Sequence, residues 1–105
     1  DAVFAVDQVG ADWMEQAAKK AESYLDFIAF SESGLADQLE YEGFTAEEAA
    51  HGVANSGADW MEQAAKKAES YLDFSSFSRS QLIEQLKYEG FTAEQATHGA
   101  TSVGL

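Results

Sequence analysis

The chain contains a long internal repeat, because the 18 residues Gly10–Phe27 recur without change as Gly57–Phe74. The offset of 47 residues continues downstream, where Tyr41–Glu47 recurs as Tyr88–Glu94. A repeat of this length corresponds to one supersecondary unit, and neighbouring units bury their apolar faces together. We therefore predict a tandem array of two similar units, residues 11–57 and 58–105.

The pattern of apolar residues predicts that the array is all-α. Proline is absent, and no segment alternates between apolar and polar residues. In the first unit Asp12 is a suitable N-cap for a long helix that ends near Phe27. Apolar residues recur along this helix at helical spacing and predict its buried stripe: Trp13, Ala17, Ala21, Tyr24 and Leu25.

Two shorter helices follow the long helix in each unit. Ser31 is placed to cap a helix from Glu32 to about Glu42, with Leu35 and Leu39 as its core residues. Gly43 then occupies the position at which helices commonly end in a left-handed residue. Thr45 opens a third helix, which stops at Asn55-Ser56-Gly57. Each unit is thus predicted to be a small three-helix body containing a helix-turn-helix.

The two ends of the chain are less regular than the repeat. Residues 1–10 share Ala2/Ala49, Val6/Val53 and Gly10/Gly57 with the end of a unit. We interpret them as an N-terminal helix, either the tail of a preceding unit or a segment docked on the first unit. At the other end we expect the last helix to fray within Thr101–Leu105.

The net charge of −13 argues against nucleic-acid binding by the helix-turn-helix. Duplex affinity depends on Lys and Arg side chains that neutralise phosphates. The third helix of each unit has none, and carries Glu47 and Glu48 in the first unit and Glu94 in the second. Such a surface attracts basic partners and repels nucleic acid and anionic lipid.

No residue pattern predicts catalysis or a bound cofactor. A metal site needs three or four converging ligands, whereas each unit offers one histidine, His51 or His98, and no cysteine. These histidines are interpreted as helix-end residues that interact with the helix dipole. We therefore expect no catalytic residue, no metal and no cofactor.

Several motifs in residues 18–49 recur in residues 65–96: Ala-Xaa-Lys-Ala-Glu-Ser-Tyr-Leu-Asp-Phe, Phe-Ser-Xaa-Ser, Leu-Xaa-Xaa-Gln-Leu and Tyr-Glu-Gly-Phe-Thr-Ala-Glu. Their combination resembles the Ltp family of host-cell-surface-exposed lipoproteins. The resemblance implies a protein of Gram-positive bacteria or their temperate phages, held on the outer face of the membrane by a lipid anchor on an upstream cysteine. It also implies superinfection exclusion, in which entry of DNA from a related phage is blocked. The implied target is a protein of DNA delivery, such as the tape measure protein.

Charge and resemblance together suggest that acidic side chains off the core stripe bind a Lys/Arg-rich segment of such a phage protein. The candidate partner-binding residues are Glu32, Asp37, Glu40, Glu42, Glu47, Glu48, Glu84, Glu89 and Glu94. The first unit is expected to dominate, because Glu32 and Glu40 are replaced by Arg79 and Lys87 in the second.

Two other readings are open at this point. The chain is a passive structural or interaction module of a bacterial surface lipoprotein, and its acidity serves only solubility. Alternatively it is an envelope-active enzyme, which requires a concave site that two small helical bundles do not obviously supply. The chain is expected to be a monomer.

Overall fold

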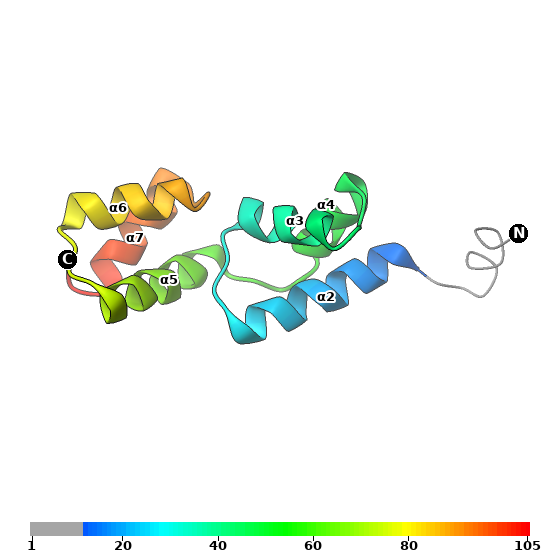
Figure 1. The fold of residues 1–105 in the computed structure, drawn as a ribbon, viewed down its shortest axis with the longest axis horizontal. Coiled ribbons are helices and arrows are strands. Elements are labelled where there is room, and N and C mark those ends of the chain that lie inside the picture. Colours follow the sequence, from blue (N-terminus) through cyan, green and yellow to red (C-terminus); the bar gives the residue numbers. More distant parts are fainter. Residues whose placement is uncertain (1–11) are drawn as a thin grey trace, which may run out of the picture.

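A computed structural model describes residues 12–105, which form six helices and no strand (Figure 1). Unit one contains α2 (Trp13–Phe27), α3 (Glu32–Tyr41) and α4 (Ala46–Ala54). Unit two contains α5 (Trp60–Phe74), α6 (Arg79–Tyr88) and α7 (Ala93–Ser102). This arrangement confirms the all-α tandem repeat. The prediction for residues 1–10 lies outside the described residues.

Each helix begins directly after the capping residue that the sequence indicated. The Asp12 carboxylate accepts hydrogen bonds from the backbone N–H groups of Met14 at 3.0 Å and Glu15 at 3.1 Å. Asp59 caps α5 in the same way. Because the first N–H groups of a helix lack intrahelical partners, these caps fix the start of each long helix.

The turn of each helix-turn-helix is built on a left-handed glycine. Gly43 has φ +108°, and its N–H donates to the carbonyl of Glu40 at 3.0 Å. The N–H of Phe44 donates to the carbonyl of Leu39 at 3.2 Å, which completes a Schellman motif. Gly90 forms the same turn in unit two, so the predicted helix-turn-helix is confirmed in both units.

Small residues allow the long helix of each unit to approach the third helix closely. Helix α2 packs mainly against α4, and Ala17 and Ala21 are fully buried. A Cβ atom placed on Gly52 would lie 2.7 Å from the carbonyl carbon of Ala17. Only glycine therefore permits this crossing.

Each unit has its own small core. The core of unit one contains Ala21, Leu35, Leu39, Ala49 and Val53, and the core of unit two contains Ala64, Ala68, Leu82, Leu86, Phe91, Ala96 and Ala100. Trp60 opens unit two but packs against the core of unit one. Its equivalent Trp13 is 43% exposed, so the interpretation of Trp13 as a core residue is wrong. A tryptophan at this position packs on the preceding unit and not on its own.

The chain after α7 folds back onto unit two, which corrects the expectation of fraying. Helix α7 extends to Ser102, and the N–H of Leu105 donates to the carbonyl of Ala100 at 3.0 Å. Val103 and Leu105 pack against the core, and Arg79 donates to the carbonyl of Leu105. The last residues are held because their apolar side chains complete the core of unit two.

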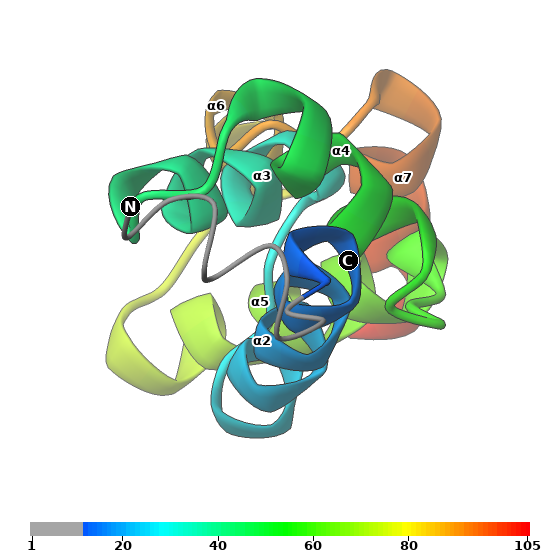
Figure 2. The ribbon, with the colours of Figure 1, turned by 90° about the vertical axis from the view of Figure 1, so that its right-hand side faces the viewer.

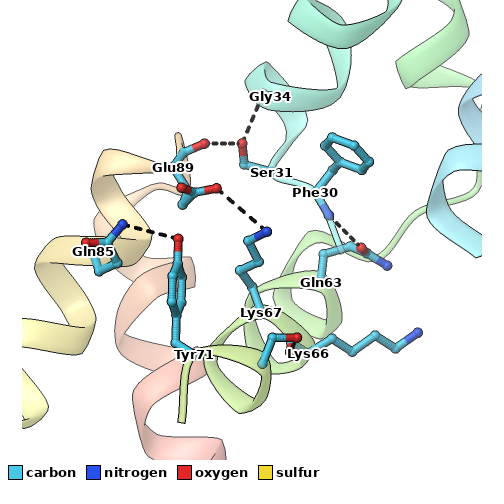
Figure 3. Close-up of polar contacts among 10 residues, drawn as sticks. Phe30, Ser31, Gly34, Gln63, Lys66, Lys67, Tyr71, Gln85 and Glu89 are labelled. Atoms are coloured by element: carbon cyan, nitrogen blue, oxygen red, sulfur yellow. Dashed lines mark hydrogen bonds and ion pairs between the residues drawn. The ribbon is translucent and has the colours of Figure 1, made fainter. Parts of the chain in front are cut away.

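The two units stack end to end, with overall dimensions of 56 × 23 × 18 Å (Figures 1 and 2). The start of α3 in unit one meets the end of α6 in unit two. The Ser31 hydroxyl donates to the carbonyl of Glu89 at 2.6 Å, and the N–H of Phe30 donates to Oε1 of Gln63 at 3.1 Å (Figure 3). Ser31 and Gln63 are the two buried polar side chains of the described residues. The units therefore form a defined junction.

Between residues 12 and 105 no helix combines the length and apolarity that crossing a membrane requires.

Candidate protein-binding surface

Four of the nine predicted partner-binding acids are engaged within the protein. Glu42 accepts a 2.6 Å hydrogen bond from the Tyr24 hydroxyl, and Glu48 accepts one from the N–H of Thr45 at 2.9 Å. Oε1 of Glu89 lies 3.8 Å from Nζ of Lys67, and Oε1 of Glu84 lies 3.9 Å from Nζ of Lys87. These carboxylates stabilise helix ends and local ion pairs, so they are less available to a partner.

The remaining five acids are exposed and have neither an ion pair nor a side-chain hydrogen bond within the described chain. They are Glu32, Asp37, Glu40, Glu47 and Glu94. Three of them lie on α3, and Asp37 and Glu40 share one face of that helix because they are three residues apart. The nine acids are therefore not equivalent, and the largest group of unpaired acids lies on α3.

The lysines of unit one do not neutralise the acids of α3. Lys19 pairs with Glu15 at 3.4 Å. Lys20 lies 3.8 Å from Glu42 and 5.6 Å from the centroid of the Tyr24 ring. Both cations belong to α2, so the charge of the α3 carboxylates is uncompensated within unit one.

An exposed tyrosine accompanies these carboxylates. Tyr41, at the end of α3, is 84% exposed, and its counterpart Tyr88 is 85% exposed. Tyr41 lies one helical turn after Asp37 and directly follows Glu40. Large aromatic side chains at the surface are enriched in protein interfaces, where they contribute much of the binding energy.

The sequence analysis did not identify this tyrosine as a binding residue. A usable signal was present: Tyr41 and Tyr88 recur in both units although they lie off the Leu35–Leu39 stripe. Phe27 and Phe74 show the same combination, being 89% and 90% exposed at the ends of the long helices. An aromatic residue that recurs without a core position indicates a role at the surface.

A hollow at the junction adjoins the face that carries Asp37 and Tyr41. Its volume is about 360 Å³, and its lining includes Ile28, Asp37, Tyr41, Lys67 and Glu89. Ile28 is half exposed at its edge. We define the α3 surface as Ile28, Asp37, Glu40 and Tyr41. It offers an apolar contact, an aromatic ring and two free carboxylates.

This chemistry suits a basic peptide. Carboxylates pair with Lys and Arg, and the face of a tyrosine ring attracts the same cations by about 0.5–1 kcal/mol at an exposed site. The equivalent part of α6 differs, because Arg79 and Lys87 stand where α3 has Glu32 and Glu40.

Other kinds of site find little support in residues 12–105. No group of three His, Cys, Asp or Glu side chains in this part of the chain could hold a metal ion. His51 is exposed, and the Asn55 side chain donates to its backbone carbonyl at 2.8 Å. Helices α4 and α7, the second helices of the helix-turn-helix pairs, carry no Lys or Arg.

Comparison with known proteins yields a family and a structural relative. A family model described as host cell surface-exposed lipoprotein (Ltp) matches residues 12–55 and 59–103. The structure is similar to that of Ltp, a superinfection exclusion protein from the Streptococcus thermophilus temperate phage TP-J34, with a TM-score of 0.81 and 29% sequence identity. The similarity covers 87% of this chain and 95% of that chain. No curated protein sequence matches the chain.

Proposed function

The chain belongs to the family of host cell surface-exposed lipoproteins, and on this basis we propose that it acts in superinfection exclusion by binding a protein of the incoming phage. The proposed partner is a basic segment of the DNA-delivery machinery, of the kind found in a tape measure protein. Stoichiometric binding of that segment blocks DNA injection, and no catalysis is needed. The proposed location is the outer face of a Gram-positive cell membrane, with a lipid anchor in the full-length precursor.

The observation that carries this proposal is the α3 surface. Its two unpaired carboxylates, Asp37 and Glu40, precede an almost fully exposed tyrosine on the same helix, and the lysines of unit one are engaged elsewhere. A Lys/Arg-rich helix meets opposite charge on this surface together with a ring on which a cation can rest. The net charge of −13 also accelerates the encounter with a basic partner.

The first test separates the stages of infection. Cells that display the chain on a lipid anchor are challenged with related phages, and adsorption and DNA entry are scored independently. We expect normal adsorption and blocked DNA entry. Unimpeded entry of every related phage would instead support the passive structural module as the role of the chain.

Matched tyrosine variants test the surface itself. Tyr41→Ala and Tyr88→Ala remove the same side chain at nearly equal exposure, but Tyr41 follows Glu40 whereas Tyr88 follows Lys87. We expect Tyr41→Ala to weaken exclusion and Tyr88→Ala to leave it nearly intact. Equal behaviour of the two variants would show that the α3 surface is not the binding site.

Charge reversal gives an independent control. Asp37→Lys with Glu40→Lys changes the net charge as much as Glu69→Lys with Asp73→Lys on α5, and all four positions are exposed. We expect only the first pair to abolish exclusion. Binding of the purified chain to a basic phage tail protein should also weaken with salt, because charges are screened over about 8 Å at physiological ionic strength. Loss of exclusion with both pairs would assign the effect to net charge alone.

A further inference from the structure

Unit two accepts hydrogen bonds from unit one at Gln63, Glu89 and Gly90. We name these residues, with the adjacent Lys67 and Phe91, the receiving face. Gln63 accepts the hydrogen bond from Phe30, and the carbonyls of Glu89 and Gly90 accept hydrogen bonds from Ser31 and Ser33 at 2.6 and 3.4 Å. Gln63 and Phe91 are buried, at 6% and 4% exposure.

The same face exists on unit one, residue for residue, and within residues 12–105 no second unit covers it; we call it the open face. Its members are Gln16, Lys20, Glu42, Gly43 and Phe44. Gln16 is exposed, and a Cβ atom placed on Gly43 would meet nothing within 4 Å. On Gly90 the same atom would lie 2.2 Å from the Ser33 hydroxyl. The two faces thus differ in occupancy and not in composition.

Two hollows mark the open face of unit one. One, of about 380 Å³, is lined by Trp13, Glu42, Gly43, Phe44 and Glu48. The other, of about 330 Å³, includes Gln16 and Lys20 in its lining and shares Glu42 and Phe44 with the first. Trp13 is 43% exposed here, whereas Trp60 is partly buried and packs against the core of the preceding unit.

The element that docks on a receiving face has specific features in unit one. Segment 28–34 reads Ile-Ala-Phe-Ser-Glu-Ser-Gly, and Gly34 lies against the junction. A Cβ atom on Gly34 would lie 2.8 Å from the Ser31 hydroxyl and 3.5 Å from the carbonyl oxygen of Glu89. Gly34 therefore leaves space beside the Glu89 carbonyl, where a Cβ atom would come into van der Waals contact with unit two and a longer side chain has less room.

Unit two does not preserve this element. Segment 75–81 reads Ser-Ser-Phe-Ser-Arg-Ser-Gln, so two apolar residues are replaced by serine and Gly34 is replaced by Gln81. The Gln81 side chain folds back, and its Oε1 accepts a hydrogen bond from the N–H of Ser78 at 3.0 Å. In repeat arrays, a terminal unit carries a polar outer end that does not propagate stacking. Unit two has that character, and a second copy of this chain is accordingly a poor occupant for the open face.

From the identity of the two faces we infer that the open face of unit one is a docking site for a further copy of the repeat. The occupant is a unit whose second helix starts with Phe-Ser-Xaa-Ser-Gly, as α3 does. In the docked state its phenylalanine N–H donates to the Gln16 side chain, and its two serine hydroxyls donate to the carbonyls of Glu42 and Gly43. Trp13 then packs against the core of that unit, as Trp60 packs against unit one.

A three-unit array tests this inference. A duplicate of residues 12–58 is joined ahead of Asp12 of the chain, so that the natural connection between units is kept and docking occurs at high effective concentration. Only the Trp13 that directly follows the added unit is kept, and all other tryptophans are replaced by phenylalanine. We expect the emission of Trp13 to shift to the blue, and its quenching by acrylamide to fall to that of Trp60 in the two-unit chain. Unchanged emission and quenching would overturn the inference.

Gln16→Ala supplies the matched control. In the two-unit chain Gln16 is exposed, so the substitution should leave Trp13 fluorescence unchanged. In the three-unit array it removes an inter-unit hydrogen bond and should lower the ratio of docked to undocked units about fivefold. A substitution without effect in both proteins would refute the proposed geometry.

The identity of the occupant is tested separately. An array in which the added unit carries Ser-Ser-Phe-Ser-Arg-Ser-Gln at the start of its second helix should leave Trp13 exposed. Burial of Trp13 in that array, or concentration-dependent association of the two-unit chain in the ultracentrifuge, would overturn the requirement for the Phe-Ser-Xaa-Ser-Gly start.

Discussion

Alanine substitutions at Gly43 and Gly90 should affect stability very differently although the two glycines have the same backbone conformation. Both have φ +108°, where a Cβ atom costs about 1–2 kcal/mol. This strain is common to the two variants. Any difference between them therefore measures what surrounds each glycine.

Gly43 has open space around it, whereas Gly90 lies against the start of α3. Its new Cβ atom would lie 2.2 Å from the Ser33 hydroxyl and 2.7 Å from the Ser31 hydroxyl, so the start of α3 must move away. The hydrogen bond from Ser31 to the carbonyl of Glu89 is then lost, together with that from Ser33. Each lost bond costs about 1 kcal/mol, so we expect Gly90→Ala to destabilise the chain by about 1–3 kcal/mol more than Gly43→Ala.

Thermal unfolding followed by circular dichroism measures this difference. For a chain of this size, 1 kcal/mol corresponds to a shift of roughly 4–8 °C in Tm. Trp60 fluorescence in a Trp13→Phe background reports the junction directly, because Trp60 packs on unit one. Equal Tm values for Gly43→Ala and Gly90→Ala, with unchanged Trp60 emission, would refute the contact between the α3 start and unit two.

Two further predictions follow from contacts within unit one. The hydrogen bond to the Glu42 carboxylate raises the pKa of Tyr24 above its usual value of 10.0, whereas burial is the main cause of the raised pKa of Tyr71. Since the folded-state pKa of Tyr24 is raised, the stability from this bond is present below pH 10 and is lost as the pH rises through that pKa. Glu42→Gln should lower the pKa of Tyr24 and leave that of Tyr71 unchanged in an NMR titration of labelled tyrosines; equal shifts would contradict this cause. Gly52→Ala should destabilise the chain by about 1–3 kcal/mol through its clash with Ala17, although alanine in a helix ordinarily gains about 1 kcal/mol over glycine. Denaturant unfolding gives the sign, and a stabilised variant would refute the close crossing of α2 and α4.

The sequence predicted the helices because their signals are local. Asp12, Ser31 and Thr45 cap helices as expected, and Gly43 forms the predicted left-handed turn. Each of these residues acts on backbone groups only a few positions away. Local chemistry of this kind can be read without knowledge of the tertiary arrangement.

Features that depend on the stacking of units were not predictable in the same way. Trp13 and Trp60 lie in identical sequence segments. Within residues 12–105 only Trp60 follows another unit, and it packs against the core of that unit. Gln16 and Gln63 differ in burial for the same reason. A repeat sequence specifies what each face can contact and does not specify which face is occupied.

The candidate site was predicted only in part. Sequence reasoning located the acids but treated them as equivalent, because hydrogen bonds such as that from Tyr24 to Glu42 span 18 positions. The α3 surface also depends on Tyr41, whose exposure follows from the path of α3 over the core. Net charge indicates the type of partner, whereas the positions of free carboxylates require the fold.

The junction has a consequence for how this array can change over time. At this junction the Ser31 and Ser33 hydroxyls donate to main-chain carbonyl oxygens of the Glu89–Gly90 turn, so these contacts depend on the backbone of unit two and not on the identity of its side chains. The charged side chains of α3 and α6, such as Glu40 and Lys87, take no part in those bonds. The surface charge of these helices can therefore change while the contacts that hold the two units together are conserved.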